Sequence, residues 1–414
     1  MRTLTLSVRI LAAILVFAPS PSAQNAVIVV DDDGGHDFTT IQAAINSAAD
    51  GDTILVRDGT YDGLMTIAGK SLSVIAEAGA QVSVSPYPWV EVSGLEWDQQ
   101  VLIRGIDVQN SLGSETAISL AHSDGVIWLE DVKVQPRDTN GVHSGLVNVS
   151  RCLAVHLTRT EVAGIAGLNW AGVGTQSTPG GHALTAYDSH LAIWDSRFEG
   201  GAGGRGGATP LTLYYGSAGG DGLQAIGGTV FLSKSLSQGG SSGVPFPPSE
   251  SGGDGLYLAN VEATTLDSTL EGGSGTYPGW DVRLLSGSTH RELAGTGRSL
   301  EATSPHREGE TSTFSVTGEP GDLVYLVLGV APVHAMVFGN RGVLAVKPST
   351  YMHLGSLDAT GSLVVPATLS VGLLPPGVDA THLYVQALII DDPATAPVKF
   401  TGSATVLSIL NAAL

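Results

Sequence analysis

The chain has 414 residues, a formal net charge of −20, 55 glycines and only 14% charged residues. Ordinary domains carry about 7% glycine and about 25% charged residues, so small polar and apolar side chains must make up much of this surface. The acidic balance, with no run of Lys or Arg, argues against nucleic-acid binding and against simple binding of polyanions. Abundant glycine and β-branched residues predict an all-β fold with many turns.

The first 24 residues, "MRTLTLSVRILAAILVFAPSPSAQ", have a positive start, a short apolar core and a small-residue end. This pattern predicts a secretory signal peptide, and with it a secreted, extracellular or cell-surface protein. No later apolar stretch reaches about 20 residues, so no membrane span is expected. The one cysteine, Cys152, cannot form an intrachain disulfide and is expected to be a small buried thiol.

The stretch "HDFTTIQAAINSAADGDTILVRDGTYDG" (36–63) begins with a short amphipathic helix pattern. Two threonines precede the pattern and can cap the helix. One face of this helix would be apolar, through Phe38, Ile41, Ile45 and Ala48. Such a helix would cover the open end of a repeat structure.

A repeat follows this helix. Full copies align without gaps from three starts, and partial copies begin earlier, at Val101, Ile127 and Val155. The full copies start at His182, Asp221 and Asp254. Each unit of about 25 residues has short alternating runs that cannot bury an apolar face alone, whereas stacked copies can. Residues 25–285, with the capping helix, are therefore predicted to form a parallel β-helix of about seven coils.

The segment "FTTIQAAINSAADGDTILVRDGTY" (38–61) resembles the N-terminal segment of the pectin-lyase-like right-handed β-helix superfamily. That superfamily includes pectate lyases, pectin methylesterases, polygalacturonases and many secreted proteins without an assigned activity. The resemblance covers residues 36–285 and implies a right-handed solenoid. The sequence lacks the paired-Asp, Gly-His-Gly and Arg-x-Pro-x-x-Arg patterns of the enzyme families, so the resemblance implies no enzyme class.

Two aligned columns of the repeat alternate in charge, the first from its second member onward and the second over its first four members. The first contains Gly105, Asp131, Arg159, Asp195, Lys234 and Asp267, and the second contains Asp107, Lys133, Glu161, Arg197, Leu236 and Thr269. Opposite charges on stacked strands stabilise the correct register, because a slip by one coil would place like charges together. Both ladders are expected to point outward and to be solvated, so that each pair contributes little alone.

Four insertions follow the glycine pair that ends each coil, so they are expected on one side of the solenoid. They carry the candidate substrate-binding residues Trp170, Arg205, Tyr214, Tyr215, Tyr277 and Trp280. Aromatic rings on such loops suit stacking against sugars. The alternative is that the rings pack beneath their own loops.

A further column contains His182, Asp221 and Asp254, with no basic residue between the two carboxylates. Three readings remain open. The aspartates can bond backbone in Asp-Gly turns, bind a cation such as calcium, or act with His182 as a catalytic pair in glycoside chemistry. The acidic stretch "VDDDGGHDF" (30–38) resembles a calcium loop only loosely, and a solvated turn is expected there.

An outward aromatic strip is unusual for a solvated face. It contains Trp128, His156, Trp194 and Phe231. The strip is expected to lie beneath the C-terminal domain or a loop, and the alternative is a platform for sugars.

Residues 286–310 are predicted to be a linker, and 311–414 a small antiparallel β-sandwich that serves binding, anchoring or stability. The whole is read as a secreted, monomeric protein that binds or processes extracellular polysaccharide or a cell-surface glycan. If it is an enzyme, a polysaccharide lyase or glycoside hydrolase is expected. The alternative is a non-catalytic structural or adhesive cell-surface protein.

Overall fold

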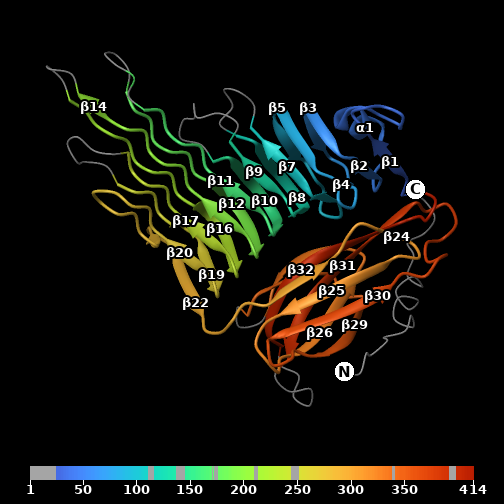
Figure 1. The fold of residues 1–414 in the computed structure, drawn as a ribbon. Helices are drawn as coiled ribbons and strands as arrows, with labels where there is room; N and C mark the ends of the chain where they lie inside the picture. The colour runs from blue at the N-terminus through green and yellow to red at the C-terminus, as the bar shows by residue number, and fades with distance from the viewer. Residues whose placement is uncertain are drawn as a thin grey trace.

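The computed structural model describes residues 25–110, 116–136, 145–169, 171, 176–208, 213–243, 251–337, 341–390 and 398–414. Within them the chain is all-β, with a right-handed parallel β-helix followed by an antiparallel β-sandwich (Figure 1). The expected signal peptide lies outside the described residues. Among the residues described, no helix is long and apolar enough to cross a membrane.

A short helix covers the first coil, as the sequence predicts. Helix α1 (Ile41–Ser47) follows Thr40, whose hydroxyl accepts a hydrogen bond from the Ala43 amide at 3.4 Å. The residues that α1 buries in the core of the coil stack are Ile41, Ala44 and Ile45. The helix therefore closes the end of the apolar core that a solenoid would otherwise expose.

Each coil contributes to three parallel sheets. Sheet A contains β1 (Val27–Val30), β2 (Thr53–Val56), β4 (Leu72–Ala76), β6 (Gln100–Arg104), the second halves of β8 (Ile118–Glu130), β10 (Val147–Thr158), β12 (Leu184–Trp194) and β16 (Leu223–Ser233), then β19 (Glu262–Leu266) and β22 (Thr289–Leu293). The long strands bend at the corner between sheets C and A and so belong to both.

The other two sheets complete the coil. Sheet B contains the first halves of β3 (Gly59–Ala68) and β5 (Val82–Ser93), then β7 (Ile106–Gln109), β9 (Lys133–Gln135), β11 (Glu161–Ala163), β13 (Arg197–Glu199), β17 (Leu236–Gln238) and β20 (Thr269–Glu271). Sheet C contains the second halves of β3 and β5, the first halves of β8, β10, β12 and β16, then β18 (Leu256–Ala259) and β21 (Val282–Leu284).

The stacking register is the one that the aligned repeats predict. Val101 lies opposite Ile127, and Ile103 lies opposite Leu129. Val155 continues the first column in the next coil. All five side chains are at most 1% exposed. Inward positions therefore alternate with outward ones along each strand, and the stacked coils share one apolar core.

The first charged column lies at the corner between sheets A and B rather than within a strand. Its non-glycine members have positive φ angles, from 49° at Arg159 and Asp267 to 54° at Asp131. A residue in the left-handed region turns the chain sharply, and Asp adopts it more readily than most residues. The second column lies in sheet B in the predicted order, with Lys133 opposite both Asp107 and Glu161.

The C-terminal part consists of mainly antiparallel sheets, with one short parallel pairing at the edge of the second. One sheet contains β23 (Ser299–Ala302), β25 (Thr311–Thr317) and β30 (Ser362–Thr368). A second contains β24 (His306–Arg307), β32 (Val398–Leu410), β31 (Ala380–Ile390), β26 (Leu323–Gly329) and β29 (Thr350–Ser356). A hairpin contains β27 (Pro332–Met336) and β28 (Val343–Val346).

The segment expected as a linker is shorter in the structure. Strand β22 extends the coil stack to Leu293, because it pairs in parallel with β19. Strand β23 already belongs to the sandwich, through its antiparallel pairing with β25. Only residues 294–298 connect the two parts, and Arg298 at their end is fully buried beside Asp322, with a 2.8 Å hydrogen bond.

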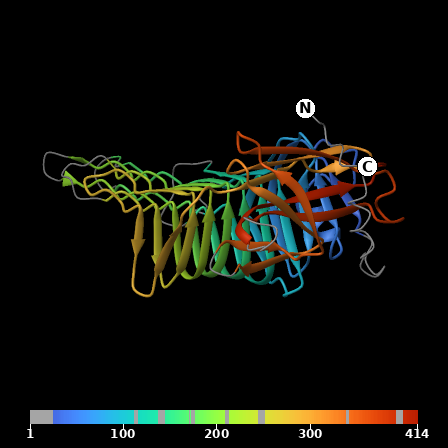
Figure 2. The ribbon, with the colours of Figure 1, turned by 90° about the horizontal axis from the view of Figure 1, so that it is seen from below.

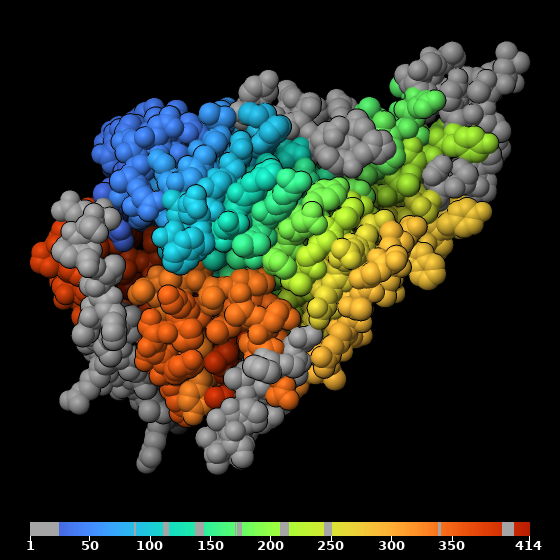
Figure 3. Space-filling view, turned by 180° about the vertical axis from the view of Figure 1, so that it is seen from behind, coloured from blue at the N-terminus to red at the C-terminus, as the bar shows by residue number. Residues whose placement is uncertain are grey.

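The sandwich packs on the outer face of sheet A (Figure 3). Trp128, Trp194 and Phe231 are at most 1% exposed and share one apolar cluster with Tyr384 and Val406 of the sandwich. The outward aromatic strip is therefore covered by the C-terminal domain, as one of its two readings predicts, and it is not a platform for sugars. Strands β31 and β32 bury both faces, one in the sandwich core and one against sheet A.

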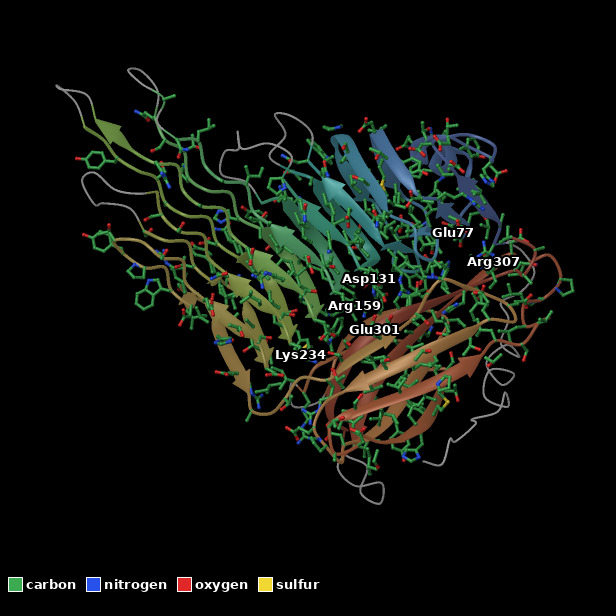
Figure 4. All side chains as sticks on the ribbon, in the orientation of Figure 1. Glu77, Asp131, Arg159, Lys234, Glu301 and Arg307 are labelled. Atoms are coloured by element: carbon green, nitrogen blue, oxygen red, sulfur yellow. The ribbon has the colours of Figure 1, made fainter. Side chains whose placement is uncertain are left out.

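A charged network lies inside this interface. Glu130 is fully buried, and its carboxylate accepts hydrogen bonds from Arg159, from the Thr405 hydroxyl and from the Val406 amide at 3.0 Å. Arg159 also donates to Asp131 at 2.6 Å. Figure 4 shows charged side chains along the line where the two parts meet, namely Glu77, Asp131, Arg159, Lys234, Glu301 and Arg307.

The prediction that the first ladder is solvated is therefore wrong, because the sandwich covers its central members. Burial by itself raises the pKa of Asp131, but Arg159 and Arg104 together hold it below its ordinary value. The second ladder does face solvent: the side chains of Lys133 and Glu161 are 50% and 55% exposed and 3.7 Å apart.

Candidate functional site

The loops that interrupt the coils leave on one side, between sheets B and C, and extend as a thin layer (Figures 1 and 2). We call this layer the arm. Its outgoing legs are residues 164–169, 200–206, 239–243 and 272–275, and its returning legs are 176–181, 215–220, 251–253 and 277–281. The pair β14 (Gly207–Ala208) and β15 (Leu213–Tyr214) continues the second loop. The insertions thus gather on one side, as their place in the repeat predicts.

Hydrogen bonds in the arm repeat every third residue. Gly200 and Gly203 donate to the neighbouring outgoing leg, both at 2.8 Å. Gly201 and Gly204 donate instead to a returning leg, at 2.8 and 2.9 Å. A period of three residues, with hydrogen bonds to neighbouring legs rather than within a leg, is the geometry of packed polyproline II helices. The arm is therefore a two-layer lattice of glycine-rich helices of this type.

Glycine occupies most of the lattice positions where legs touch on both sides. A Cβ atom at Gly201 would lie 1.9 Å from the carbonyl oxygen of Ile165, and one at Gly240 would lie 2.0 Å from that of Gly201. Backbone oxygens held by the lattice cannot move away from such contacts. As in collagen, glycine predominates where the helices touch, although Ser217 and Ser242 occupy two such positions, and the third residue of each triplet is free to vary.

The column of His182, Asp221 and Asp254 occupies such third positions at the root of the returning legs. His182 Nδ1 accepts a hydrogen bond from the Asp221 amide at 2.9 Å, and Asp221 Oδ1 accepts one from the Asp254 amide at 2.7 Å. Asp254 Oδ1 in turn accepts the Trp280 amide at 2.8 Å. Each side chain therefore bonds the backbone of the next coil rather than that of its own Asp-Gly segment, so these contacts differ from the turn expected there.

The two carboxylates of this column are largely buried, with 8% of Asp221 and 4% of Asp254 exposed. Burial raises the pKa of Asp254, and the neighbouring Asp221 carboxylate raises it further. The hydrogen bond from the Trp280 amide and the charge of Arg283 act in the opposite direction and lower the pKa, but the net effect is an increase. Arg283 Nη1 lies 3.5 Å from Asp254 Oδ2. The arrangement thus joins successive coils. The second carboxylate oxygen of Asp221 lies 3.2 Å from His182 Nδ1 and accepts a hydrogen bond from Gln224, and that of Asp254 lies beside Arg283.

Only part of the expected substrate-binding set can be placed. Tyr215, Tyr277 and Trp280 are 52%, 61% and 66% exposed, so these rings do not pack beneath their loops. Arg205 is also exposed, and its amide donates to Asn169 Oδ1 at 2.8 Å. Trp170 and the side chain of Tyr214 lie outside the described residues.

A groove of about 380 Å³ crosses three outgoing legs of the arm. Its lining comes from the ends of sheet B and the first triplet of each leg: Glu199, Gly200, Ala202, Gln238, Gly239, Gly240, Ser241, Gly272, Gly273 and Ser274. The loop that carries Tyr277 and Trp280 continues directly from the last of these legs. A Cβ at Gly272 would lie 3.0 Å from the Trp280 carbonyl carbon, so this loop borders the groove.

The groove is the feature that sequence reasoning missed. The stretch "GGAGGRGG" (200–207) shows the three-residue period, but it reads equally well as a flexible loop. Only the stacking of several legs makes a surface from it. Alignment of the glycine pairs of successive coils is the signal that could have indicated such a lattice.

Two other groups have little connection to the arm. Among the described residues, Asp31, Asp32 and Asp33 are the one cluster of at least three potential metal ligands, and Asp32 already accepts the Thr60 amide at 2.9 Å. Cys152 is fully buried, and burial raises its pKa to about 11, as expected for an unreactive thiol.

Comparison with known proteins gives limited similarity. No protein-family model and no curated protein matches the chain. A solved structure of pectate lyase Pel9A is 14% identical, with a TM-score of 0.30 over 66% of this chain and 77% of that one. The catalytic domain of a GH87 alpha-1,3-glucanase, in complex with tetrasaccharides, is 8% identical, with a TM-score of 0.17 over 66% and 71%. The chain's own strand pairing therefore establishes its fold, a right-handed parallel β-helix of the type that the segment 38–61 predicts.

Proposed function

We propose that this protein is secreted and binds extracellular polysaccharide through the arm. The observation that carries the proposal is the exposure of Tyr277 and Trp280 on a loop that borders a polar groove. Aromatic rings at binding surfaces combine a large apolar face with little loss of conformational freedom. Rings of this kind beside hydrogen-bonding groups suit a sugar, which presents both apolar faces and hydroxyl groups.

The lattice supports this role because it holds the legs in place. Each leg between its neighbours is bonded through backbone amides, and its glycines leave no space for movement at the contacts. A preformed surface does not lose free energy in becoming ordered when a ligand binds. The arm therefore presents its third-position side chains and its loop aromatics as a rigid, repeated surface.

Binding fits the geometry better than cleavage does. A retaining or inverting glycosidase needs two carboxyl groups that both reach the scissile bond. Asp221 and Asp254 instead each direct one oxygen to a backbone amide of the next coil. We therefore propose a binding or adhesive protein, with these residues as part of the support beneath the arm.

The test compares exposed aromatic residues inside and outside the arm. Tyr277→Ala and Trp280→Ala should each weaken polysaccharide binding about tenfold or more, which corresponds to at least ~1.4 kcal/mol. Tyr351→Ala and Trp97→Ala are matched controls, because these rings are 61% and 79% exposed elsewhere in the chain. A glycan array identifies the ligand and titration calorimetry measures the affinities. Equal losses in all four variants, or in none, would contradict the proposal.

A further inference from the structure

We propose that the groove across the outgoing legs takes a neutral polysaccharide chain that runs along the axis of the coil stack. This inference rests on the function proposed above and names the class of its ligand. It assigns the contacts to the first triplets of three successive legs, 200–202, 239–241 and 272–274.

The direction of the chain follows from the geometry of the groove. The three triplets begin at neighbouring, hydrogen-bonded strand ends, since Gly200 donates to Gln238 at 2.8 Å and Gly239 donates to Glu271 at 2.8 Å. Stacked strands repeat at about 4.8 Å. The groove therefore offers a similar set of groups once per coil. A ligand that uses all of them must also be a repeating polymer, aligned with the stack rather than with a single leg.

The chemistry of the lining is rich in groups that bond hydroxyls. Gln238, Ser241 and Ser274 bring an amide and two hydroxyl groups, and Glu199 brings acceptor oxygens. Within the described ranges, the backbone amides of Ala202, Ser241 and Ser274 have no hydrogen-bond partner. A sugar hydroxyl both donates and accepts, so it can satisfy donors and acceptors that alternate along such a groove.

The charge of the groove selects against anionic chains. No Lys or Arg is among the described residues that line it, and the nearby Arg197 is already paired with Glu199 of the same strand. A uronate polymer would bring its carboxylates against Glu199 and against a chain with a net charge of −20. Like charges at a binding surface oppose association unless a cation bridges them. A neutral hexose polymer meets no such repulsion.

The experiment uses the full chain with a neutral β-glucan, a neutral mannan and polygalacturonate as probes. The expected result is binding to at least one neutral polymer, with at least tenfold lower affinity for polygalacturonate. Ser241→Arg should reduce neutral binding at least tenfold, because it fills the groove. Ser286→Arg is the matched control, since Ser286 is an exposed serine outside the arm and the groove lining.

Each outcome decides between the two proposals. Preference for polygalacturonate would overturn the neutral ligand but leave polysaccharide binding intact. Neutral binding that survives Ser241→Arg would overturn the groove as its site. Binding to no polymer on the probe panel or on a glycan array would overturn the proposed function itself. If Ser241→Arg lowers the melting temperature, Ala202→Arg serves instead, because Ala202 is also an exposed third-position residue of the groove.

Discussion

At the scale of single residues, the arm depends on which position of the glycine triplet a residue occupies. His182, Asp221 and Asp254 follow glycine pairs, and their side chains bond the backbone of the next coil. In the sequence these three residues resemble an acid–base cluster, because carboxylates without a basic neighbour suggest catalysis or a cation. Their contacts with the next coil, on which the proposed supporting role rests, depend on the stacking of coils, which a single repeat does not reveal.

The glycine requirement predicts a sharp difference between adjacent positions. Gly240→Ala should destabilise the arm by ~3 kcal/mol, because its Cβ would lie 2.0 Å from a fixed carbonyl oxygen. Ser241→Ala should change stability by less than ~0.5 kcal/mol, since its side chain is exposed. Hydrogen exchange of the arm amides measures both effects. Similar exchange in the two variants would refute the lattice as the source of rigidity.

At the scale of elements, two charge ladders that look alike in the sequence have different surroundings. The Lys133–Glu161 pair of sheet B is half exposed. The Arg159 guanidinium at the A–B corner bonds Glu130 and Asp131 beneath the sandwich. The alternation of charge predicts that the columns stack, but it does not predict which column another domain covers.

This difference predicts unequal costs of removing one positive charge. Arg159→Ala should destabilise the chain by ~3 kcal/mol, because the fully buried Glu130 carboxylate then keeps only the more distant Arg104, at 3.5 Å. Lys133→Ala should cost ~1 kcal/mol or less, since its pair is solvated. Denaturant unfolding of both variants provides the comparison. Equal costs would mean that the interface does not bury this network.

Much of the β-helix could be predicted from the sequence, because its repeat is local and periodic. The inward column of Val101, Ile127 and Val155 follows from alternation and alignment alone. The arm could not be predicted in the same way, because its legs lack hydrophobic periodicity and gain structure only from neighbouring legs. Strand β22, within the segment 286–310 that the sequence predicts as a linker, could not be predicted either. It carries polar residues such as His290 and Glu292 at positions that are apolar in earlier coils, so the repeat pattern is lost there.

At the scale of the whole molecule, histidines lie in the interface between the two parts. His156 of sheet A is fully buried, and its Nε2 lies 3.2 Å from Nδ1 of His334 in the hairpin β27–β28. His382 of the sandwich bonds Thr53 of sheet A at 2.9 Å. Burial lowers the pKa of all three, to about 4 for His334 and His382. Their neutral forms are therefore the ones that the docked state accommodates.

The interface should consequently weaken in acid. When the two parts separate, these histidines become exposed and regain a pKa near 6.5, whereas in the docked state the pKa of His334 and His382 is about 4. Between these two pH values the separated state binds protons that the docked state does not, so docking loses stability as the pH falls through this window. His382→Gln should reduce the pH dependence, because it removes one of these groups and keeps hydrogen-bonding capacity. Small-angle scattering at pH 7 and pH 4.5 would detect separation of the two parts. A compact shape with unchanged stability at both pH values would count against this account.

The central claim is that the arm is the polysaccharide-binding surface, and a hydrogen-exchange footprint with and without a bound neutral oligosaccharide tests it most directly. The account predicts slower amide exchange in residues 200–202, 239–241 and 272–281, with no change in the sandwich. Protection that falls on the sandwich or on sheets A and C, with none in the arm, would contradict it.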